Sequence, residues 1–482
     1  MVKRLNKANQ SQKTEARELR REIRKKDKEI AALKWENSKR KKAITLLRKK
    51  SDKDLKTIAR LEEELRIAKL PKDSSNSSRP PSTDLYKPVR NKNCSLRKKS
   101  GKKTGGQPGH KGTTLAFCHD EPDEIITHSP TVCSGCGGDL SQIKGQLDQT
   151  HQVVDSTVPK RILINHRSIM KKCTCGQCNK GSFPPGAKGV VNYGPGIRAL
   201  VANLSVRQYV SFARIVEFFS DTLKIQISEG TIANLLKQFT DNGMIRYNEI
   251  HDQVMKATVI GADETSVKVS GKKWWMHTYQ TDQLTFIGAH PSRGQVAQEC
   301  FFPGGFPDSI LVTDCLAMQL STPAAGHQVC NAHLLRELKL MRQSHPEISW
   351  PEQMSILLMD ALRLHGKDPT PNKITRIENR LTKLLEQDMS NAPGKISAFW
   401  KRLVKHKEKV FLFLKYSDVP PDNNASERAI RNVKVKAKVS GQFRSGTGTM
   451  QYAVIRSIID TANKQGLNIH QELLRIASLR KP

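Results

Sequence analysis

Three acidic side chains stand in settings where a lone carboxylate is unusual. Asp263 interrupts the alternating, β-branched pattern of a strand predicted at Thr258–Val269. Asp314 follows the short apolar run Ile310–Val312, which is typical of a buried central strand. Glu427 falls in the first turn of a helix predicted after a pair of prolines. Each residue alone also fits an ordinary role, as a strand-end acid or as a partner of the helix dipole.

Taken together, the three carboxylates suit the chemistry of phosphoryl transfer. A buried carboxylate is costly unless it is paired or binds a metal ion. Mg²⁺ accepts a few carboxylates and leaves room for water and phosphate oxygens. Asp263, Asp314 and Glu427 could hold two such ions about 4 Å apart, the arrangement that serves in-line displacement at phosphorus. We therefore predict a catalytic site built from two strands and a helix, with Mg²⁺ or Mn²⁺ as its cofactor.

Several segments around these acids resemble the catalytic domain of the insertion-sequence-66 family of bacterial transposases. They read GADETSVKVSGKKWWMHTY, ILVTDC, HQVCNAHLLREL and DNNASERAIRNVKVKAKVSGQFRSG. The upstream strings SSNSSRPPSTD and GGQPGHKG are similar to the same family, so the resemblance covers nearly the whole chain. It places Asp263, Asp314 and Glu427 on the family's DDE triad. One departure is Cys315-Leu316 after Asp314, where the family commonly has Gly and an aromatic residue.

The resemblance implies an RNase H-like catalytic core interrupted by a helical insertion. The residue patterns predict three strands and a helix ahead of the Asp314 strand, near 258–269, 273–281, 284–290 and 293–301. The resemblance also includes a Cys330-x-x-His333 element. Both a metal site and a buried Cys beside a hydrogen-bonded His fit that element.

Cations follow Glu427 along its predicted helix and into the next loop. They would hold the DNA backbone beside the metal site, and they are Arg428, Arg431, Lys434, Lys436, Lys438 and Arg444.

Four cysteines in two C-x-x-C pairs indicate a structural zinc site. Cys133 and Cys136 form one pair, and Cys175 and Cys178 form the other. Such pairs in a reducing compartment favour Zn²⁺ over disulfides. Cys173 is an alternative ligand, and a redox-active dithiol is the rival interpretation. The region resembles the zinc-binding domain of the same transposase family.

The charge of the chain points to a polyanionic partner, and DNA is the usual one. The net charge is +35, and residues 1–112 hold 35 Lys or Arg against 13 Asp or Glu, a surplus of 22. The chain has no apolar run of about 18 residues and no signal-peptide pattern, so we expect no membrane partner and a cytoplasmic, nucleoid-associated protein.

The N-terminal segment carries a heptad pattern that predicts self-association. Position a takes Ala16, Ile23, Ile30, Asn37, Ile44, Ser51, Ile58 and Leu65. Position d takes Leu19, Lys26, Leu33, Arg40, Leu47, Asp54, Leu61 and Ala68. Ile at a with Leu at d favours parallel dimers, although the layer at Ser51 and Asp54 is polar. A single solvated helix is the alternative.

The predicted fold class is a multi-domain α/β protein. An RNase H-like catalytic core with a helical insertion is preceded by coiled-coil, zinc-binding and helical DNA-binding regions. Helices at Ser211–Leu223 and Ser228–Phe239 fit a helix-turn-helix, in which Asn234, Lys237 and Gln238 could reach DNA, or a plain helical spacer. The predicted boundaries are a coiled coil at 1–70, a basic disordered linker at 71–112, a zinc-binding domain at 113–190, a helical region at 191–250, the catalytic domain at 251–465 with its insertion at about 334–418, and a helical tail at 466–482.

The resulting hypothesis is a DNA transposase of an insertion sequence, which cleaves element ends and joins them to target DNA. Its partners would be the terminal repeats, target DNA, a second copy of the chain and companion proteins of the same element. A non-catalytic zinc-containing DNA-binding protein and an RNase H-like nuclease without strand transfer are the alternatives.

Overall fold

The computed structural model describes residues 2–69, 119, 121–150, 152–153, 161–172, 174–175, 177–184 and 191–479. The predicted linker at 71–112 and Cys173 lie outside these residues. The chain divides into two compact units. One comprises Met1–Lys87 with Gly326–Asp422, and the other comprises Pro88–Ala325 with Asn423–Pro482.

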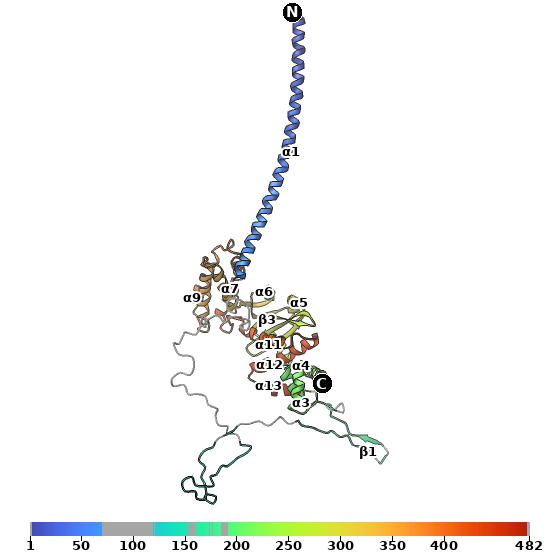
Figure 1. The fold of residues 1–482 in the computed structure, drawn as a ribbon, viewed down its shortest axis with the longest axis vertical. Helices are drawn as coiled ribbons and strands as arrows, with labels where there is room; N and C mark the ends of the chain where they lie inside the picture. The colour runs from blue at the N-terminus through green and yellow to red at the C-terminus, as the bar shows by residue number, and fades with distance from the viewer. Residues whose placement is uncertain are drawn as a thin grey trace. The chain divides into compact units, whose positions relative to one another are not determined.

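A five-stranded sheet has the strand order β5-β4-β3-β6-β7 (Figure 1). Antiparallel pairs join β3 to β4 and β4 to β5, while β6 runs parallel to β3. The strands are β3 (Val259–Val269), β4 (Lys272–Gln280), β5 (Thr285–His290), β6 (Phe306–Thr313) and β7 (Ala324–Val329). The mixed α/β class expected from the sequence is confirmed, and the first three strands lie within a residue or two of their predicted positions.

The β3–β4 hairpin closes through a two-residue turn. Ser270 and Gly271 both have positive φ, 47° and 78°, as the tight hairpin turn with two left-handed residues requires. Only Val259–Ala262 of β3 pair with β6, so the rest of the hairpin extends beyond the end of β6.

Helices of the second unit pack on the sheet through one large apolar core. α11 contacts β3, and α12 contacts β5 and α4 (Figure 1). The ring of Tyr247 on α4 stacks on Phe286 at 4.8 Å between centroids, and its hydroxyl donates to the Ile287 carbonyl at 2.8 Å. The helices of this unit are α2 (Pro195–Ala202), the π-helix η2 (Asn203–Arg207), α3 (Phe212–Asp221), α4 (Glu229–Met255), α5 (Gln295–Phe301), α6 (Ala317–Ser321), α11 (Asn424–Ser440), α12 (Gly446–Lys464) and α13 (Ile469–Ser478).

The helix predicted at Ser228–Phe239 is the first half of α4. Ser228 caps it, accepting a hydrogen bond from the Thr231 backbone N–H at 3.1 Å. The helix continues to Met255 because its apolar stripe continues, with Tyr247 and Val254 buried in the core. It therefore runs through residue 250, where the sequence predicts a domain boundary.

In the described residues of the first unit, the regular elements are helices and part of β7. Its longest element, α1, is one 67-residue helix (Val2–Ala68; Figure 1). The others are α7 (Asn331–Ser344), α8 (Trp350–Leu362), α9 (Pro371–Leu385), α10 (Gly394–Lys405) and the short 3-10 helices η3 (Lys407–Lys409) and η4 (Leu412–Leu414). Among the helices of the described ranges, none is long and apolar enough to cross a membrane.

Candidate active site

The pairing of two strands brings two of the predicted catalytic carboxylates to the same level of the sheet. Ala262 pairs with Thr313 as the last pair of the parallel β3–β6 ladder. The next residue on each strand is the candidate ligand, Asp263 or Asp314. Directly paired residues of a parallel ladder share a face, so the two acids extend from neighbouring positions of the sheet. Oδ1 of Asp263 accepts a hydrogen bond from the Glu264 backbone N–H at 2.8 Å.

The start of α11 lies against β3 immediately before Asp263. The Asn423 side-chain amide donates to the Ala262 carbonyl at 2.7 Å. A Cβ on Gly261 would lie 2.7 Å from Ser426 Oγ and 3.0 Å from Asn423 Oδ1, so the close approach depends on a residue without a side chain. This contact positions the first turn of α11, which contains Glu427, beside the strand of Asp263.

Glu427 lies in the first turn of α11, as predicted. Its side chain is 20% exposed, and Oε2 lies 3.9 Å from an Arg431 guanidinium nitrogen one turn along the helix. Asn423 occupies the N-cap position, whereas Asn424 and Ser426 lie inside the helix. Asn423 has no side-chain capping bond within the helix because its amide is directed to β3.

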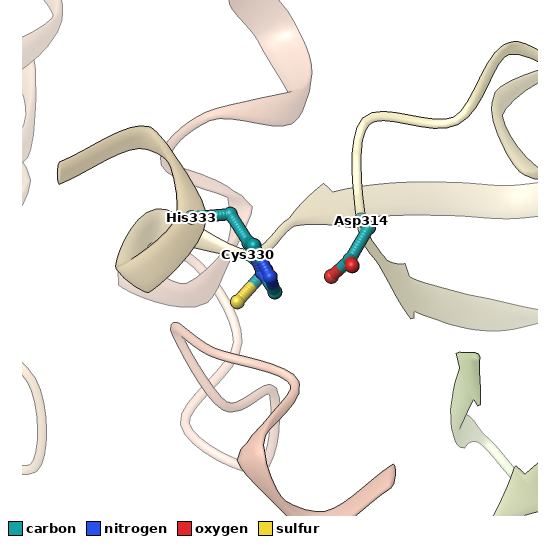
Figure 2. Close-up of side chains that lie close together, drawn as sticks. All are labelled: Asp314, Cys330 and His333. Atoms are coloured by element: carbon teal, nitrogen blue, oxygen red, sulfur yellow. The ribbon is translucent and has the colours of Figure 1, made fainter. Parts of the chain in front are cut away.

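The three carboxylates share one region of the second unit without forming a closed cage. Their oxygens do not all lie within 4.8 Å of one another. Asp314 follows the last residue of β6 at the start of a loop (Figure 2). The donor set of three carboxylates and nearby polar groups fits Mg²⁺ or Mn²⁺, which prefer oxygen ligands and retain several waters.

Glu264 is a residue of this region that the sequence reasoning missed. Its side chain is 3% exposed, and Oε1 accepts two hydrogen bonds from Arg293, at 2.9 and 2.7 Å. Oε2 accepts from Gln319 of α6 at 2.7 Å. Burial raises the pKa of the Glu264 carboxyl, against the opposing effect of Arg293, and the Asp314 charge raises it further. The sequence signal that could have identified Glu264 was a second acidic residue directly after Asp263 within the predicted strand.

A small cavity of about 10 Å³ adjoins these residues, lined in part by Asp263, Glu264 and His277. Its size corresponds to about one water molecule. Burial lowers the pKa of His277 to about 4, so this imidazole is neutral at neutral pH. Polar groups therefore surround the sheet position of Asp263 on more than one side.

Most of the predicted DNA-binding cations are exposed. Arg428, Arg431, Lys434 and Lys438 recur every three or four residues along α11 and form one stripe, and Arg444 is exposed in the following loop. Lys436 differs because its ammonium donates to the Ser205 carbonyl at 3.3 Å, and burial lowers its pKa. The structure thus places Lys436 in a contact with η2 rather than on the exposed stripe.

The two cysteine pairs lie in separate turns. The backbone N–H of Cys133 donates to the Gly138 carbonyl at 2.9 Å, and that of Gly137 donates to the Cys133 carbonyl at 2.9 Å. Hydrogen bonds from Cys136 and Gly135 lower the pKa of the Cys133 thiol, which favours a metal-binding thiolate. Cys178 begins β2 (Cys178–Lys180), the partner of β1 (Met170–Lys172).

No three of the four thiol sulfurs lie within 4.8 Å of one another. The structure therefore builds the individual turns and does not bring the four predicted zinc ligands together.

Cys330 and His333 belong to the first unit, at the start of α7 (Figure 2). Cys330 is fully buried, and its carbonyl accepts a hydrogen bond from the His333 backbone N–H at 3.1 Å. The His333 ring lies 3.1 Å from an Arg336 guanidinium nitrogen. These contacts agree with a buried Cys beside a hydrogen-bonded His at a strand-to-helix turn.

Comparison with known proteins adds two family matches. A family model described as Transposase IS66 family matches residues 190–451, which is more than half of the chain. A second model, described as a family of unknown function (DUF6444), matches residues 5–116. A search of curated proteins gave no match. The first match includes all three candidate catalytic carboxylates.

Proposed function

The chain belongs to the IS66 family of transposases, and from this premise we propose that it is a DDE transposase. Membership supports a transposase function and implies DNA as a partner. The proposed reaction is metal-dependent cleavage at the ends of an insertion sequence, followed by transfer of the freed strand ends into target DNA. Asp263, Asp314 and Glu427 are the proposed metal ligands.

The observation that carries this proposal is the alignment of Asp263 and Asp314 across β3 and β6, with α11 held against β3. Sequence positions far apart thereby contribute acids to one region of one unit. DDE transposases generally use divalent metal ions. When bound, such an ion lowers the pKa of a water and stabilises charge on the phosphate oxygens.

The protein's own groups orient the substrate and the carboxylates. The exposed stripe of α11, Arg428, Arg431, Lys434 and Lys438, begins one residue after Glu427, so phosphates held there would lie close to the carboxylate site. Glu264 joins Arg293 to Gln319 of α6, the helix that follows the Asp314 loop. We propose that this network fixes the position of Asp314.

The strand order supports an RNase H-like core. Three antiparallel strands are followed by a β6 strand that adds, parallel, to the other edge of β3. Hairpins join β3 to β4 and β4 to β5, and a crossover then returns the chain to β6, which lies beside β3. The first two acids of the proposed triad lie on those two strands.

A labelled element end, incubated with Mg²⁺ and a target plasmid, tests the proposed function. Joined products establish transposase chemistry. Cut but unjoined ends in the presence of the element's companion proteins would favour a nuclease. Binding without either product under the same conditions would favour a non-catalytic DNA-binding protein.

We also propose that Cys133, Cys136, Cys175 and Cys178 bind one structural Zn²⁺. Native mass spectrometry is expected to show one zinc per chain, which Cys133→Ser removes because thiolate ligands supply most of the affinity. Cys300→Ser is the matched control, since Cys300 is exposed but lies on α5 outside both pairs. A wild-type protein without zinc, or zinc retained in Cys133→Ser at full occupancy, would contradict the assignment.

The contacts of α1 support self-association through its heptad seam. The buried His345 ring lies 2.9 Å from Glu63 Oε2, and Arg66 lies 3.2 Å from Glu347 Oε2. Glu63 and Arg66 occupy heptad positions f and b, on the opposite side of the helix from a and d. Seam residues such as Ile30 and Leu47 stay 49% and 65% exposed, so this intramolecular contact leaves the seam accessible to a second copy.

Substitutions at two adjacent leucines test whether dimerisation depends on the heptad seam or on exposed apolar side chains in general. Leu47 is at position d and Leu46 at position c, and they are 65% and 68% exposed. Leu47→Glu should weaken the dimer at least about a hundredfold, because each chain loses about 1.5–3 kcal/mol of leucine burial. Leu46→Glu should leave the dimer intact. Light scattering over a concentration series measures dimer dissociation for both variants. Equal weakening in the two variants, or a monomeric wild type, would contradict dimerisation through the heptad seam.

A further inference from the structure

The part of the β3–β4 hairpin that extends beyond β6 has one covered and one open face. Thr265, Val267 and Val269 are buried on the covered face, while Ser266 and Lys268 alternate with them and are exposed. The edge of β3 in this part of the hairpin pairs with the loop after α11 through a parallel bridge between Val269 and Phe443. The Ser270 backbone N–H donates to the Phe443 carbonyl at 2.9 Å, and that of Phe443 donates to the Lys268 carbonyl at 2.9 Å.

The open face carries three cations and a tryptophan. We define the open ribbon face by Ser266, Lys268, Lys273, Trp275 and Arg293. The Lys273 ammonium lies 4.8 Å from the centre of a Trp275 ring, and the Arg293 guanidinium carbon lies 4.7 Å from it. Cation–π contacts of this kind hold both charges over one small area.

Two of these cations are unfavourably placed for the fold alone. Lys268 pairs directly with Lys273 across the hairpin, and both are exposed. Directly opposite like charges destabilise a strand pair. A local arrangement that opposes stability is expected where a site serves binding, and an anion between the two ammonium groups would remove the repulsion.

The open ribbon face is linked to the carboxylate site through Arg293. This guanidinium, 47% exposed, donates to Glu264, whose neighbour in β3 is Asp263. The Asp314 charge acts on the same Glu264 carboxyl. Lys268 lies four residues beyond Glu264 along β3, about 13 Å at about 3.3 Å per residue. Asp263 alternates with Glu264 and shares the face of Thr265, so the open ribbon face adjoins the carboxylate site through Glu264, on the other side of the hairpin.

We infer that the open ribbon face binds the phosphodiester backbone of DNA beside the carboxylate site. This inference rests on the proposed function and adds a second DNA contact, separate from the exposed stripe of α11. Lys268, Lys273 and Arg293 contact phosphates, and Trp275 positions two of them. The alternative role for lysines on a projecting hairpin is to prevent edge-to-edge aggregation, which involves no DNA.

The test measures DNA affinity against salt for the full-length chain, with a short duplex of arbitrary sequence as the probe. The variant is Lys268→Ala with Lys273→Ala. Each lost phosphate contact lowers the slope of log affinity against log salt by about 0.9, so the slope should fall by about 1.8. At about 0.1 M salt this corresponds to roughly fiftyfold weaker binding.

Lys272→Ala is the matched control. Lys272 is exposed and adjacent to Lys273, but it pairs with Val269 and lies on the opposite face. We expect its slope to match that of the wild type. An equal loss in Lys272→Ala would indicate a diffuse field around the hairpin tip and overturn the inference, as would an unchanged slope in the double variant.

The affinity measurement, taken together with the cleavage and joining assay, distinguishes failure of this inference from failure of the proposed function. If the wild type cleaves and joins element ends while the double variant binds DNA normally, the ribbon inference is wrong and the proposed function stands. If the wild type binds no DNA at any salt concentration, both are wrong.

Discussion

Asp263→Asn is expected to slow metal-dependent cleavage and joining by at least about a thousandfold. An amide is a neutral and weaker metal ligand than a carboxylate, and the bound ion supplies several kcal/mol of charge stabilisation, at about 1.4 kcal/mol per tenfold in rate. DNA affinity should change little, because the proposed phosphate contacts come from Lys and Arg side chains and not from Asp263. Product formation per unit time from a labelled element end measures the effect.

Asp252→Asn is the matched control for this substitution. The Asp252 side chain is 67% exposed on α4 and lies outside the sheet position of the triad. It should retain the wild-type rate. Cleavage by Asp263→Asn at the wild-type rate would remove Asp263 from the proposed metal ligands.

Asp460→Ala is expected to destabilise the second unit by about 3–5 kcal/mol, because it leaves a buried charge without its partner. The Arg456 and Asp460 side chains are 8% and 11% exposed and lie 2.5 Å apart on α12. Arg456 also donates to the Tyr209 hydroxyl at 3.2 Å, and Tyr209 donates to Asn432 of α11 at 2.8 Å. The loss should thus also loosen the contact between Tyr209, two residues after η2, and α11.

Denaturant unfolding of the full chain, followed by a probe in the second unit, measures this loss. The matched variant replaces both partners, Arg456→Met with Asp460→Leu, and should recover most of the stability because no uncompensated charge remains. An Asp460→Ala protein as stable as the wild type would show that Arg456 is compensated elsewhere.

The strands of the sheet were predictable because their residue patterns are local. Alternation over Val259–Val269 and the apolar run before Asp314 define strands without reference to the rest of the chain. Pairing is not local. That Ala262 pairs with Thr313, and so aligns the two acids, depends on a crossover connection that no pattern in the sequence reveals.

The features that sequence reasoning missed all depend on tertiary contacts. Glu264 looked like an ordinary strand residue until Arg293 and Gln319, each distant in sequence, were seen to bind it. Lys436 belongs to the same run of cations but lies on another face of α11, where its ammonium reaches the Ser205 carbonyl. Asn423 occupies the N-cap position of α11, but its side-chain amide binds β3 instead of the helix. In each case the residue type suggested a polar role, but the sequence did not reveal which distant residue it would contact.

Anomalous diffraction from crystals grown with DNA and Mn²⁺ tests most directly whether the three carboxylates form one metal site. We predict manganese bound by Asp263, Asp314 and Glu427, with their oxygens drawn closer together than in the protein without metal. Manganese that contacts one or two of these acids and leaves Glu427 apart from the metal would contradict the proposed triad.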